Sequence, residues 1–359
     1  MKRLFYALLC GANACTILFL WIVCASTWLE PSQFPRMSQA GLLMPAALAA
    51  NALFLIIWFA INLKGLLIPI LGMLPAYGFI LDYCPLNPDK DEHANDTTES
   101  LRVVSFNACN WSFTDSTDGE WNAKLLLDTL NADIICLQES AATHWRIRKK
   151  LKAMGYECRG VTGTSVCSRL PFVGDSIIID YEQSQNNLTA WHLKHGEDTI
   201  FLVNVHLQST KLPPDEKKHF NEHLHSRDKE QLEQTGRLML NYLSQAAVMR
   251  STQTAMLDSV IRSHEGESII LCGDFNETPI SYSYQKMKHR LKSCFRESGL
   301  GLGFSYNNPG FWVRIDHIFT SDDWMSTNTH IVRTFRCSDH YPIVTTLHKR
   351  EHKGASGQK

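Results

Sequence analysis

Three long apolar runs within residues 1–83 limit the folds open to this chain more than any other feature. They cover residues 4–25, 41–62 and 65–81 and contain almost no charged side chains. Each run approaches the ~20 residues that a helix needs to cross the hydrocarbon core of a bilayer. We therefore predict three transmembrane helices that form a membrane anchor over residues 1–83.

Two other interpretations of these runs are open. The first run could be a cleaved signal peptide, but two further apolar runs follow it in the chain. The runs could also form a buried helical hairpin of a soluble protein, which three consecutive runs of this apolarity argue against. The membrane anchor is therefore the favoured interpretation.

The few charges near the apolar runs predict an orientation. Lys2, Arg3 and Lys64 belong to one side of the membrane, whereas the loop between the first two runs carries only Arg36. Cytoplasmic loops carry an excess of Lys and Arg, so the first side is the cytoplasmic one. With three spans, the chain after Tyr83 then lies on the extracytoplasmic side.

The remaining chain has the pattern of an α/β domain. Residues 84–100 are polar and acidic without periodicity and indicate a linker. From residue 101 to 348, short apolar strands alternate with amphipathic helices, and residues 349–359 indicate a frayed tail. We therefore expect one domain over residues 101–348.

Charge and cysteine content narrow the function of this domain. Residues 84–359 hold 31 Lys and Arg against 34 Asp and Glu, a net charge of -3, which argues against non-specific binding to a nucleic-acid backbone. The 11 cysteines include no CxxC pair, which argues against a zinc site. Cys158 and Cys167 could pair in an oxidising compartment, and the sequence leaves this open.

The stretch of residues 269–279 carries the clearest chemical signal. An apolar strand ends at Gly273, and Asp274 and Asn276 follow on alternate positions, with Phe275 directed to the core. Because residues two apart in an extended segment point to the same side, a carboxylate and a carboxamide converge there. Such oxygen groups suit Mg²⁺ and a phosphate ester. The alternative is a polar turn in which both side chains bond only their own backbone.

Several other predicted strands end in the same way. Strand ends are a favoured place for a site in layered α/β proteins, and so many polar ends in one domain indicate a shared site. The residues concerned are Asn107, Glu139, His206, Asp274 with Asn276, Asp316, and Asp339 with His340.

The order of these motifs resembles that of the endonuclease/exonuclease/phosphatase superfamily. The resemblance covers roughly residues 101–348 and implies a four-layer α/β/β/α sandwich, here preceded by three transmembrane helices. The N-terminus looks like that of membrane-anchored members found in bacteria, which implies a multi-pass protein of the bacterial inner membrane. The motifs are Ser105-Phe106-Asn107, Leu137-Gln138-Glu139, Val205-His206-Leu207, Gly273-Asp274-Phe275-Asn276, Arg314-Ile315-Asp316-His317 and Ser338-Asp339-His340.

The resemblance also implies roles for single residues. Glu139 is expected to be the main ligand of Mg²⁺, with Mn²⁺ as an alternative. Asn107 is expected to support the metal or to hold a phosphate oxygen, and Asp339 to assist in positioning the metal or the water. His340 is expected to act as general base or to stabilise charge on phosphorus, with Asp316 as its orienting carboxylate.

Three further residues complete the implied catalytic set. Asp274 is expected to position or deprotonate the attacking water, while Asn276 and His206 donate hydrogen bonds to phosphoryl oxygens. Asp316 could instead form a salt bridge with Arg314, and His206 could be a hydrogen-bonded core residue. We interpret the other histidines of this region, His317, His219, His223 and His225, as solvated polar residues.

These expectations predict a membrane-anchored, Mg²⁺-dependent phosphoesterase. The membrane bilayer and a phosphate ester are its expected partners, and a lipid headgroup of the kind cleaved by sphingomyelinases is the favoured substrate. A nuclease that acts on extracytoplasmic DNA is the alternative, with nucleic acid the less favoured partner. A non-catalytic module that binds a phosphorylated ligand is a second alternative.

Overall fold

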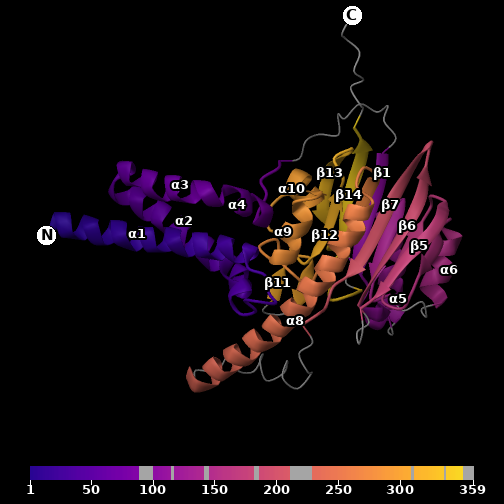
Figure 1. The fold of residues 1–359 in the computed structure, drawn as a ribbon, viewed down its shortest axis with the longest axis horizontal. Helices are drawn as coiled ribbons and strands as arrows, with labels where there is room; N and C mark the ends of the chain where they lie inside the picture. The colour runs from indigo at the N-terminus through magenta and orange to yellow at the C-terminus, as the bar shows by residue number, and fades with distance from the viewer. Residues whose placement is uncertain are drawn as a thin grey trace, which may run out of the picture. The chain divides into compact units, whose positions relative to one another are not determined.

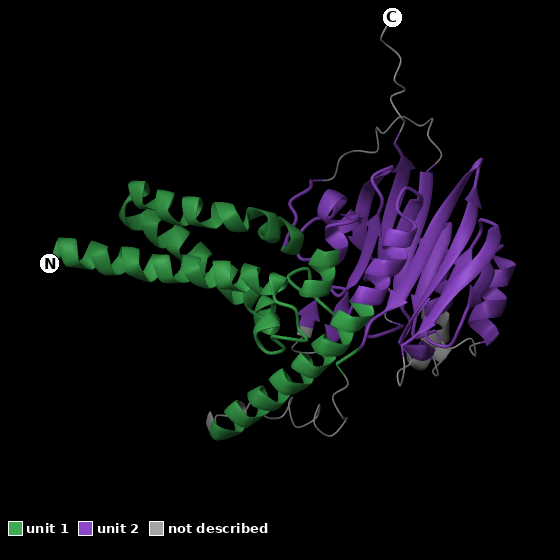
Figure 2. Cartoon of the chain, viewed as in Figure 1, with its two compact units in different colours: residues 1–83, 209–254, 277–286 green, residues 84–208, 255–276, 287–359 purple. Residues whose placement is uncertain are grey.

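The computed structural model of the protein describes residues 1–88, 100–114, 117–140, 145–181, 186–210, 229–308, 311–334 and 337–350. The chain forms two compact units that alternate along the sequence (Figure 2). Unit 1 contains residues 1–83, 209–254 and 277–286, and unit 2 contains residues 84–208, 255–276 and 287–359. Most of the expected linker at 84–100 and nearly all of the expected tail at 349–359 lie outside the described residues.

The described part of unit 1 is helical (Figure 1). Three stretches there, Lys2–Trp28, Met37–Ile61 and Leu63–Tyr83, are long and apolar enough to cross a membrane, so the three predicted apolar helices are present. The elements of these stretches are α1 (Lys2–Ala25), η1 (Ser26–Trp28), η2 (Met37–Leu43), α2 (Met44–Ile61), η3 (Leu63–Leu66), α3 (Leu67–Met73), η4 (Leu74–Ala76) and α4 (Tyr77–Tyr83).

The third apolar stretch is not one regular helix. Its α-helical parts α3 and α4 are separated by the 3-10 turn η4. Pro75 lies at the start of that turn, and a proline has no N–H to continue the helical ladder. The long helix α8 (Lys229–Ser263) and the short helix α9 (Tyr282–Lys288) begin in unit 1 and end in unit 2.

Hydrogen bonds between buried polar side chains join α1 to α2 within unit 1. The indole Nε1 of Trp58 donates to Oδ1 of Asn13 at 2.9 Å, and Nδ2 of Asn51 donates to the Thr16 carbonyl at 3.0 Å. Asn13 and Asn51 are fully buried. Because a buried polar group without a partner is costly, these bonds fix the register of the two helices.

The segment 277–286 is held inside unit 1 by side chains of the same unit. Ile280 packs in a buried cluster with Leu20, Val23, Cys24, Met44, Ala47 and Ala76. The Arg250 guanidinium, which is 1% exposed, contacts the Glu277 carboxylate at 2.8 Å. Nε2 of Gln285 donates to the Asp82 carboxylate at 2.9 Å.

Within its described residues, unit 2 is built on two six-stranded sheets and a short two-stranded ribbon (Figure 1). The first sheet has the order β13-β14-β1-β2-β4-β3 and the second the order β5-β6-β7-β8-β12-β9. The strands are β1 (Ser100–Asn107), β2 (Ile134–Gln138), β3 (Glu157–Gly160), β4 (Thr164–Ser168), β5 (Phe172–Asp180), β6 (Asn187–His195), β7 (Asp198–His206), β8 (Ser268–Asp274), β9 (Lys292–Ser293), β10 (Tyr306–Asn308), β11 (Phe311–Val313), β12 (Asp316–Thr320), β13 (Trp324–Ile331) and β14 (Ile343–Lys349).

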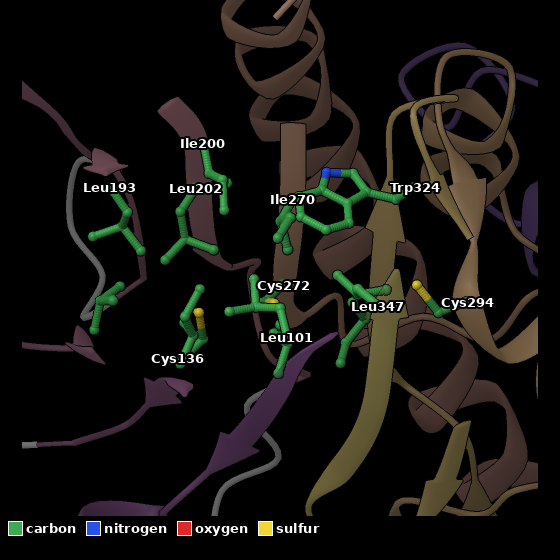
Figure 3. Close-up of a cluster of buried hydrophobic side chains, with 14 of the residues drawn as sticks. Leu101, Cys136, Leu193, Ile200, Leu202, Ile270, Cys272, Cys294, Trp324 and Leu347 are labelled. Atoms are coloured by element: carbon green, nitrogen blue, oxygen red, sulfur yellow. The ribbon is translucent and has the colours of Figure 1, made fainter. Parts of the chain in front are cut away.

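An apolar layer lies between the two sheets (Figure 3). Alternate residues of each central strand face this layer, as a period of two requires. On β8 these residues are Ile270 and Cys272, and the next alternate residue is Asp274. The corresponding residues elsewhere are Leu101 and Val103 of β1, Ile134 and Cys136 of β2, Ile200 and Leu202 of β7, Ile318 of β12, and Ile343 and Leu347 of β14.

Helices cover the outer faces of the sheets. Val104 and Phe106 of β1 pack against Leu126 of α5 (Thr117–Leu130) and Ile147 of α6 (Trp145–Ala153) in a second buried cluster. A short helix, α10 (Cys294–Ser298), adds Phe295 to the layer between the sheets. The expected four-layer α/β/β/α sandwich is confirmed by this arrangement.

Some strands do not follow the expected pattern of short apolar strands. Strand β13 is largely polar, because it lies at the edge of its sheet, where one side is solvated. The segment of residues 311–320 forms two strands, β11 and β12. Cys158 and Cys167, which face each other across β3 and β4, form a disulfide.

The approach of β7 to β8 generates a prediction about Gly273. A Cβ atom built at Gly273 lies 2.1 Å from the carbonyl oxygen of Val205, a backbone atom that cannot move aside alone. Gly273→Ala should therefore lower the free energy of unfolding by about 1–3 kcal/mol, the usual cost of overpacking. Chemical denaturation of the full chain in detergent measures this. Gly236→Ala is the control, because Gly236 lies in α8 with nothing within 4 Å of its Cβ position. Equal stability of the two variants would contradict the prediction.

Candidate active site

The register of the strands brings the predicted site residues to one end of both sheets. In the first sheet, Asn107 of β1 pairs with Gln138, the last residue of the parallel strand β2. In the second sheet, Asp274 of β8 pairs with His206 of β7 on one side and with Asp316 of β12 on the other. Three strand ends of the second sheet and two of the first therefore stop at matching positions.

Asn107 and Asp274 join the two sheets at this end. Nδ2 of Asn107 donates to Oδ2 of Asp274 at 2.9 Å and to Oε1 of Glu139 at 3.3 Å. Asn107 and Asp274 are each 1% exposed. The amide thus presents its donor to two carboxylates and keeps them close together.

The Glu139 carboxylate is more accessible than those of Asp274 and Asp316. Its side chain is 29% exposed, against 1% for Asp274 and 0% for Asp316. The backbone at Glu139 has φ 45°, in the left-handed region that residues with a Cβ rarely adopt. This conformation turns the chain directly after β2, and such strained residues cluster at functional sites. Nε2 of His206 lies 3.7 Å from Oε1 of Glu139 and 3.7 Å from Oδ2 of Asp274.

His340 and Asp316 form a buried imidazole–carboxylate pair. Nδ1 of His340 lies 2.8 Å from Oδ2 of Asp316, and Nε2 lies 3.8 Å from Oδ2 of Asp274. The His340 side chain is 6% exposed. One ring nitrogen is therefore held by Asp316, while the other is directed to Asp274.

The last two predicted residues lie beside this group. The backbone N–H of Asn276 donates to Oδ1 of Asp274 at 2.8 Å, and its Nδ2 donates to the Leu207 carbonyl at 3.0 Å. Asn276 has φ 52°, a second left-handed residue at the site. Asp339 is partly buried, and its charge acts on both Glu139 and His340. All eight predicted site residues are thus near one another.

Burial and mutual repulsion shift the protonation of the site. Burial raises the pKa of Glu139, and the hydrogen bond from Asn107 opposes this shift. Burial, together with the charge of Asp316, raises the pKa of Asp274 to about 6. Burial alone lowers the pKa of His340, but the carboxylates of Asp316 and Asp274 outweigh it and raise this pKa to about 10.

Sequence reasoning did not single out the residues that position His340. The Ser338 hydroxyl donates to the Asn107 carbonyl at 2.7 Å and accepts from the His340 N–H at 3.1 Å. The Ser305 hydroxyl accepts from the N–H of Asp316 at 3.2 Å, and its carbonyl accepts from the Tyr341 N–H at 2.7 Å. Ser338 could have been assigned from its place in the Ser-Asp-His motif, whereas Ser305 has no motif around it.

Two buried amides link the sheets behind the site. Nε2 of Gln138 donates to Oδ1 of Asn204 at 2.7 Å, and Nδ2 of Asn204 donates to the carbonyls of Leu137 and Ser165, both at 3.0 Å. Gln138 and Asn204 are fully buried. They lie on β2 and β7, between the apolar layer and the carboxylates, and sequence reasoning did not single out their contact.

Other histidines of the domain depart from the expectation or lie outside the described residues. His317 is 1% exposed, so its interpretation as a solvated residue is wrong. It alternates with Asp316 on β12 and therefore faces the opposite side of the sheet, where its ring contacts Phe275 edge-on. His219, His223 and His225 lie outside the described residues.

Arg314 was considered above as a salt-bridge partner of Asp316. In the structure its guanidinium lies over the Phe295 ring and donates to the Leu302 carbonyl at 2.8 Å, while the Asp316 carboxylate bonds His340.

A divalent cation fits the side chains at this site. Asp274, Asp316 and His340 offer ligand atoms that lie within 4.8 Å of one another, and Glu139 is placed next to Asp274 through the shared bond to Asn107. Carboxylate and amide oxygens are the ligands that Mg²⁺ prefers. Burial, with a smaller contribution from neighbouring carboxylates, raises the pKa of Glu139 and of Asp274, and a bound cation would favour their charged forms.

A small pocket lies on the outer face of the first sheet, beside α6. It has a volume of about 90 Å³, and Ser140, the residue after Glu139, is among its lining residues with Arg148 and Arg159. None of the eight predicted site residues, all of which the structure describes, lines this pocket. The lining residues include Trp111, Leu137, Ile147 and Leu151.

Comparison with known proteins supports the same class of site. A family model described as the endonuclease/exonuclease/phosphatase family matches residues 119–340. The chain belongs to the endonuclease/exonuclease/phosphatase family. Members of this family are metal-dependent phosphoesterases and nucleases, so this family member is a hydrolase of ester bonds. A second family model, described as a domain of unknown function, matches residues 3–83. No curated protein matches the sequence significantly.

Solved structures show the fold of the endonuclease/exonuclease/phosphatase family. The human nocturnin catalytic domain with bound sulfate is 15% identical, with a TM-score of 0.51, and the match covers 70% of this chain and 95% of that chain. ANGEL2, a 2',3'-cyclic phosphatase in complex with adenosine-2',3'-vanadate, is 16% identical, with a TM-score of 0.52, and the match covers 71% of this chain and 97% of that chain. At this identity the likeness shows the fold of the domain.

The His340–Asp316 pair predicts a pH dependence of stability. The pKa of His340 is about 10 in the folded protein and about 6.5 in an unfolded chain. A raised pKa stabilises the folded state fully below pH ~6.5, and this stabilisation is lost as the pH rises through about 10. In EDTA, the stability difference between wild type and His340→Gln should therefore be largest near pH ~6 and shrink towards pH ~10.

Denaturation of the full chain at several pH values measures this difference. His330→Gln is the matched control, because His330 lies in β13 and its Nδ1 bonds the carbonyl of Asn328, two residues away. A difference for His340→Gln that stays constant over this pH range would contradict the assignment of its charge.

Proposed function

We propose that this family member is a membrane-anchored, Mg²⁺-dependent phosphoesterase that hydrolyses a phosphate ester carried by a lipid or presented at a membrane surface. The convergence of polar strand ends carries the proposal. Asn107 and Glu139 from the first sheet meet Asp274, Asp316 and His206 from the second, with His340 bonded to Asp316. A binding module needs no such set of oriented acids, carboxamides and imidazoles, so the non-catalytic alternative is disfavoured.

The protonation pattern supports a division of labour between Asp274 and His340. Asp274, with a pKa of about 6, is charged at neutral pH yet basic enough to take a proton from an attacking water. His340, with a pKa of about 10, carries a proton at neutral pH, so its Nε2 can donate to a phosphoryl oxygen as negative charge develops. Asp316 holds the Nδ1 side of the ring and fixes its orientation.

The remaining residues would bind the ester and the metal. Glu139, whose side chain is 29% exposed, would hold Mg²⁺ with Asn107 and Asp339. When bound, the cation would supply Lewis-acid stabilisation of charge on the phosphoryl group and the leaving oxygen. The Asn276 and His206 side chains lie at the same strand ends and would donate to the phosphoryl oxygens from the second sheet.

The surroundings of the site favour a lipid-like ester over DNA. The three apolar helices are long and apolar enough to cross a membrane, and residues 84–359 have a net charge of -3. A nuclease is the alternative. A long basic groove at the site would favour it, because such a groove binds a nucleic-acid backbone.

The disulfide supports the extracytoplasmic side for the catalytic domain. Disulfides persist in oxidising compartments such as the bacterial periplasm and are rare in the cytoplasm. Cys158 and Cys167 are bonded across neighbouring strands of the catalytic domain. Together with Lys2, Arg3 and Lys64 on the opposite side, this favours a multi-pass inner-membrane protein with an extracytoplasmic hydrolase.

The first prediction from this proposal concerns activity. Glu139→Gln and His340→Ala should each lower the rate of hydrolysis of a generic phosphodiester by at least ~100-fold, because each removes charge stabilisation at the reacting phosphate. The full chain in detergent is assayed with Mg²⁺ and again with EDTA, which should abolish activity. Glu197→Gln is the control, since Glu197 is exposed in the turn between β6 and β7, at the other end of these strands. Full activity of Glu139→Gln would refute the proposal.

The same preparations separate the two substrate classes. Wild-type chain in liposomes is incubated with Mg²⁺ and either phospholipid and sphingomyelin vesicles or plasmid DNA. Release of a phosphorylated headgroup, absent in His340→Ala, would support the lipid-like ester. Cleavage of plasmid without headgroup release would establish the nuclease alternative.

The second prediction concerns the side of the membrane. In intact bacterial cells that are acid-quenched and treated with a thiol-reactive polymer, Cys158 and Cys167 should remain unmodified until a reductant is added. The reference is a Cys158→Ser/Cys167→Ser variant, so that the other nine cysteines can be subtracted. Modification of both thiols without reductant would place the domain in a reducing compartment.

A further inference from the structure

A second cluster of metal-ligating side chains lies at the other end of the second sheet. It consists of His192 on β6, His264 directly after α8 and Glu267 directly before β8, all within unit 2. Strand β8 runs from Ser268 beside this cluster to Asp274 in the active site. At 3.3 Å per residue, seven residues separate the two places by roughly 20 Å.

We propose that His192, His264 and Glu267 form a second metal site that takes a transition metal, with Zn²⁺ the best fit. One ligand atom from each residue lies within 4.8 Å of the other two. Nε2 of His192 lies 3.0 Å from Oε2 of Glu267. Bonds of about 2.0–2.1 Å to a tetrahedral Zn²⁺ place ligand atoms about 3.3 Å apart, so this pair is close to the required spacing.

A tight turn brings two of the ligands together. The N–H of Glu267 donates to the His264 carbonyl at 3.1 Å, which closes the turn between them. Gly266 within the turn has φ 94°, a conformation that residues with a Cβ rarely adopt. The sequence His-Glu-Gly-Glu thus places an imidazole and a carboxylate at the two ends of a turn of fixed geometry.

The hydrogen bond and packing of His264 prepare its ring for a metal. Nδ1 of His264 lies 2.8 Å from the Val260 carbonyl oxygen. Because a carbonyl can only accept, Nδ1 carries the proton and the lone pair is on Nε2. The ring is stacked on Phe201, with centroids 3.7 Å apart and planes 6° apart. Metal-bound histidines are usually oriented by such a bond from the second nitrogen to a carbonyl.

The donor set and its exposure define the kind of metal. Two imidazoles and one carboxylate favour Zn²⁺ and its neighbours among transition metals, whereas Mg²⁺ prefers oxygen ligands. The His192 and Glu267 side chains are 27% and 41% exposed, so a cation and a completing water can enter from solvent. The site uses no thiols. The absence of a CxxC pair, which argued against a zinc site held by cysteines, therefore does not bear on it.

A metal at this site would connect three elements of unit 2. His192 contacts Phe201 of β7 with ring centroids 5.0 Å apart, and the two other ligands lie between the end of α8 and the start of β8. Bound Zn²⁺ would therefore tie the end of α8 to β6 and stabilise the folded state by mass action. It would lie outside the reacting centre and act on stability rather than on the ester.

Zinc binding to the full chain in detergent tests the proposal. After EDTA treatment and dialysis, Zn²⁺ is titrated in excess Mg²⁺ with a competing chromophoric chelator, and Co²⁺ is titrated for the absorption of a tetrahedral site. Wild type should bind one Zn²⁺ that His264→Gln and Glu267→Gln lose or bind at least tenfold more weakly. It should also gain thermal stability with Zn²⁺, whereas these variants should not.

Glu265→Gln is the matched control, because Glu265 is exposed in the same turn and is not among the ligands. Zinc affinity in His264→Gln and Glu267→Gln equal to wild type would overturn the site, as would equal loss in Glu265→Gln. Both ligand variants are measured in case one of them fails to fold. The melting temperature of each variant without metal shows whether it is folded.

Discussion

Face-to-face packing of two sheets is the constraint on which the rest of the catalytic domain depends. Alternate residues of each central strand must face the other sheet, and along most of their length these residues are apolar. At one end the same positions become polar, as at Asn107, His206 and Asp274. The candidate active site is thus the end of the core, where the spacing between the sheets already sets the distance between groups that face each other.

Burial at this place disfavours charged side chains and thereby shifts their pKa values, which suits them to acid–base chemistry. Asp274 and Asp316 are buried beside each other, and burial with repulsion raises the pKa of Asp274 while their combined charge raises that of His340. Buried charges need partners, and here Asn107, His340 and a fitting cation can provide them. The bonded amides of Gln138 and Asn204 lie between the apolar layer and the carboxylates, so polarity rises gradually along β2 and β7 towards the site.

The sequence predicted those features that are local to one strand. Asp274, His206 and Glu139 could be found because each follows an apolar run, and the sandwich followed from the order of motifs. Contacts that depend on distant partners could not be found: Ser305 holds β12 in place from another segment, and the bond between Gln138 and Asn204 needs both sheets. His317 was misjudged because the face to which it points depends on the register of β12. The ligands around His264 escaped because they come from a strand and a turn that no motif connects.

The alternation of the two units along the chain has a consequence for how such a protein can be divided or evolve. Removal of residues 1–83 takes away the apolar helices but leaves residues 209–254 and 277–286, which belong to the same unit. Ile280 would then lose the side chains of Leu20 and Met44 that bury it. The apolar helices and the hydrolase domain are therefore not two independent modules joined by one linker. A chain without these helices would need polar substitutions where Ile280 loses its apolar neighbours.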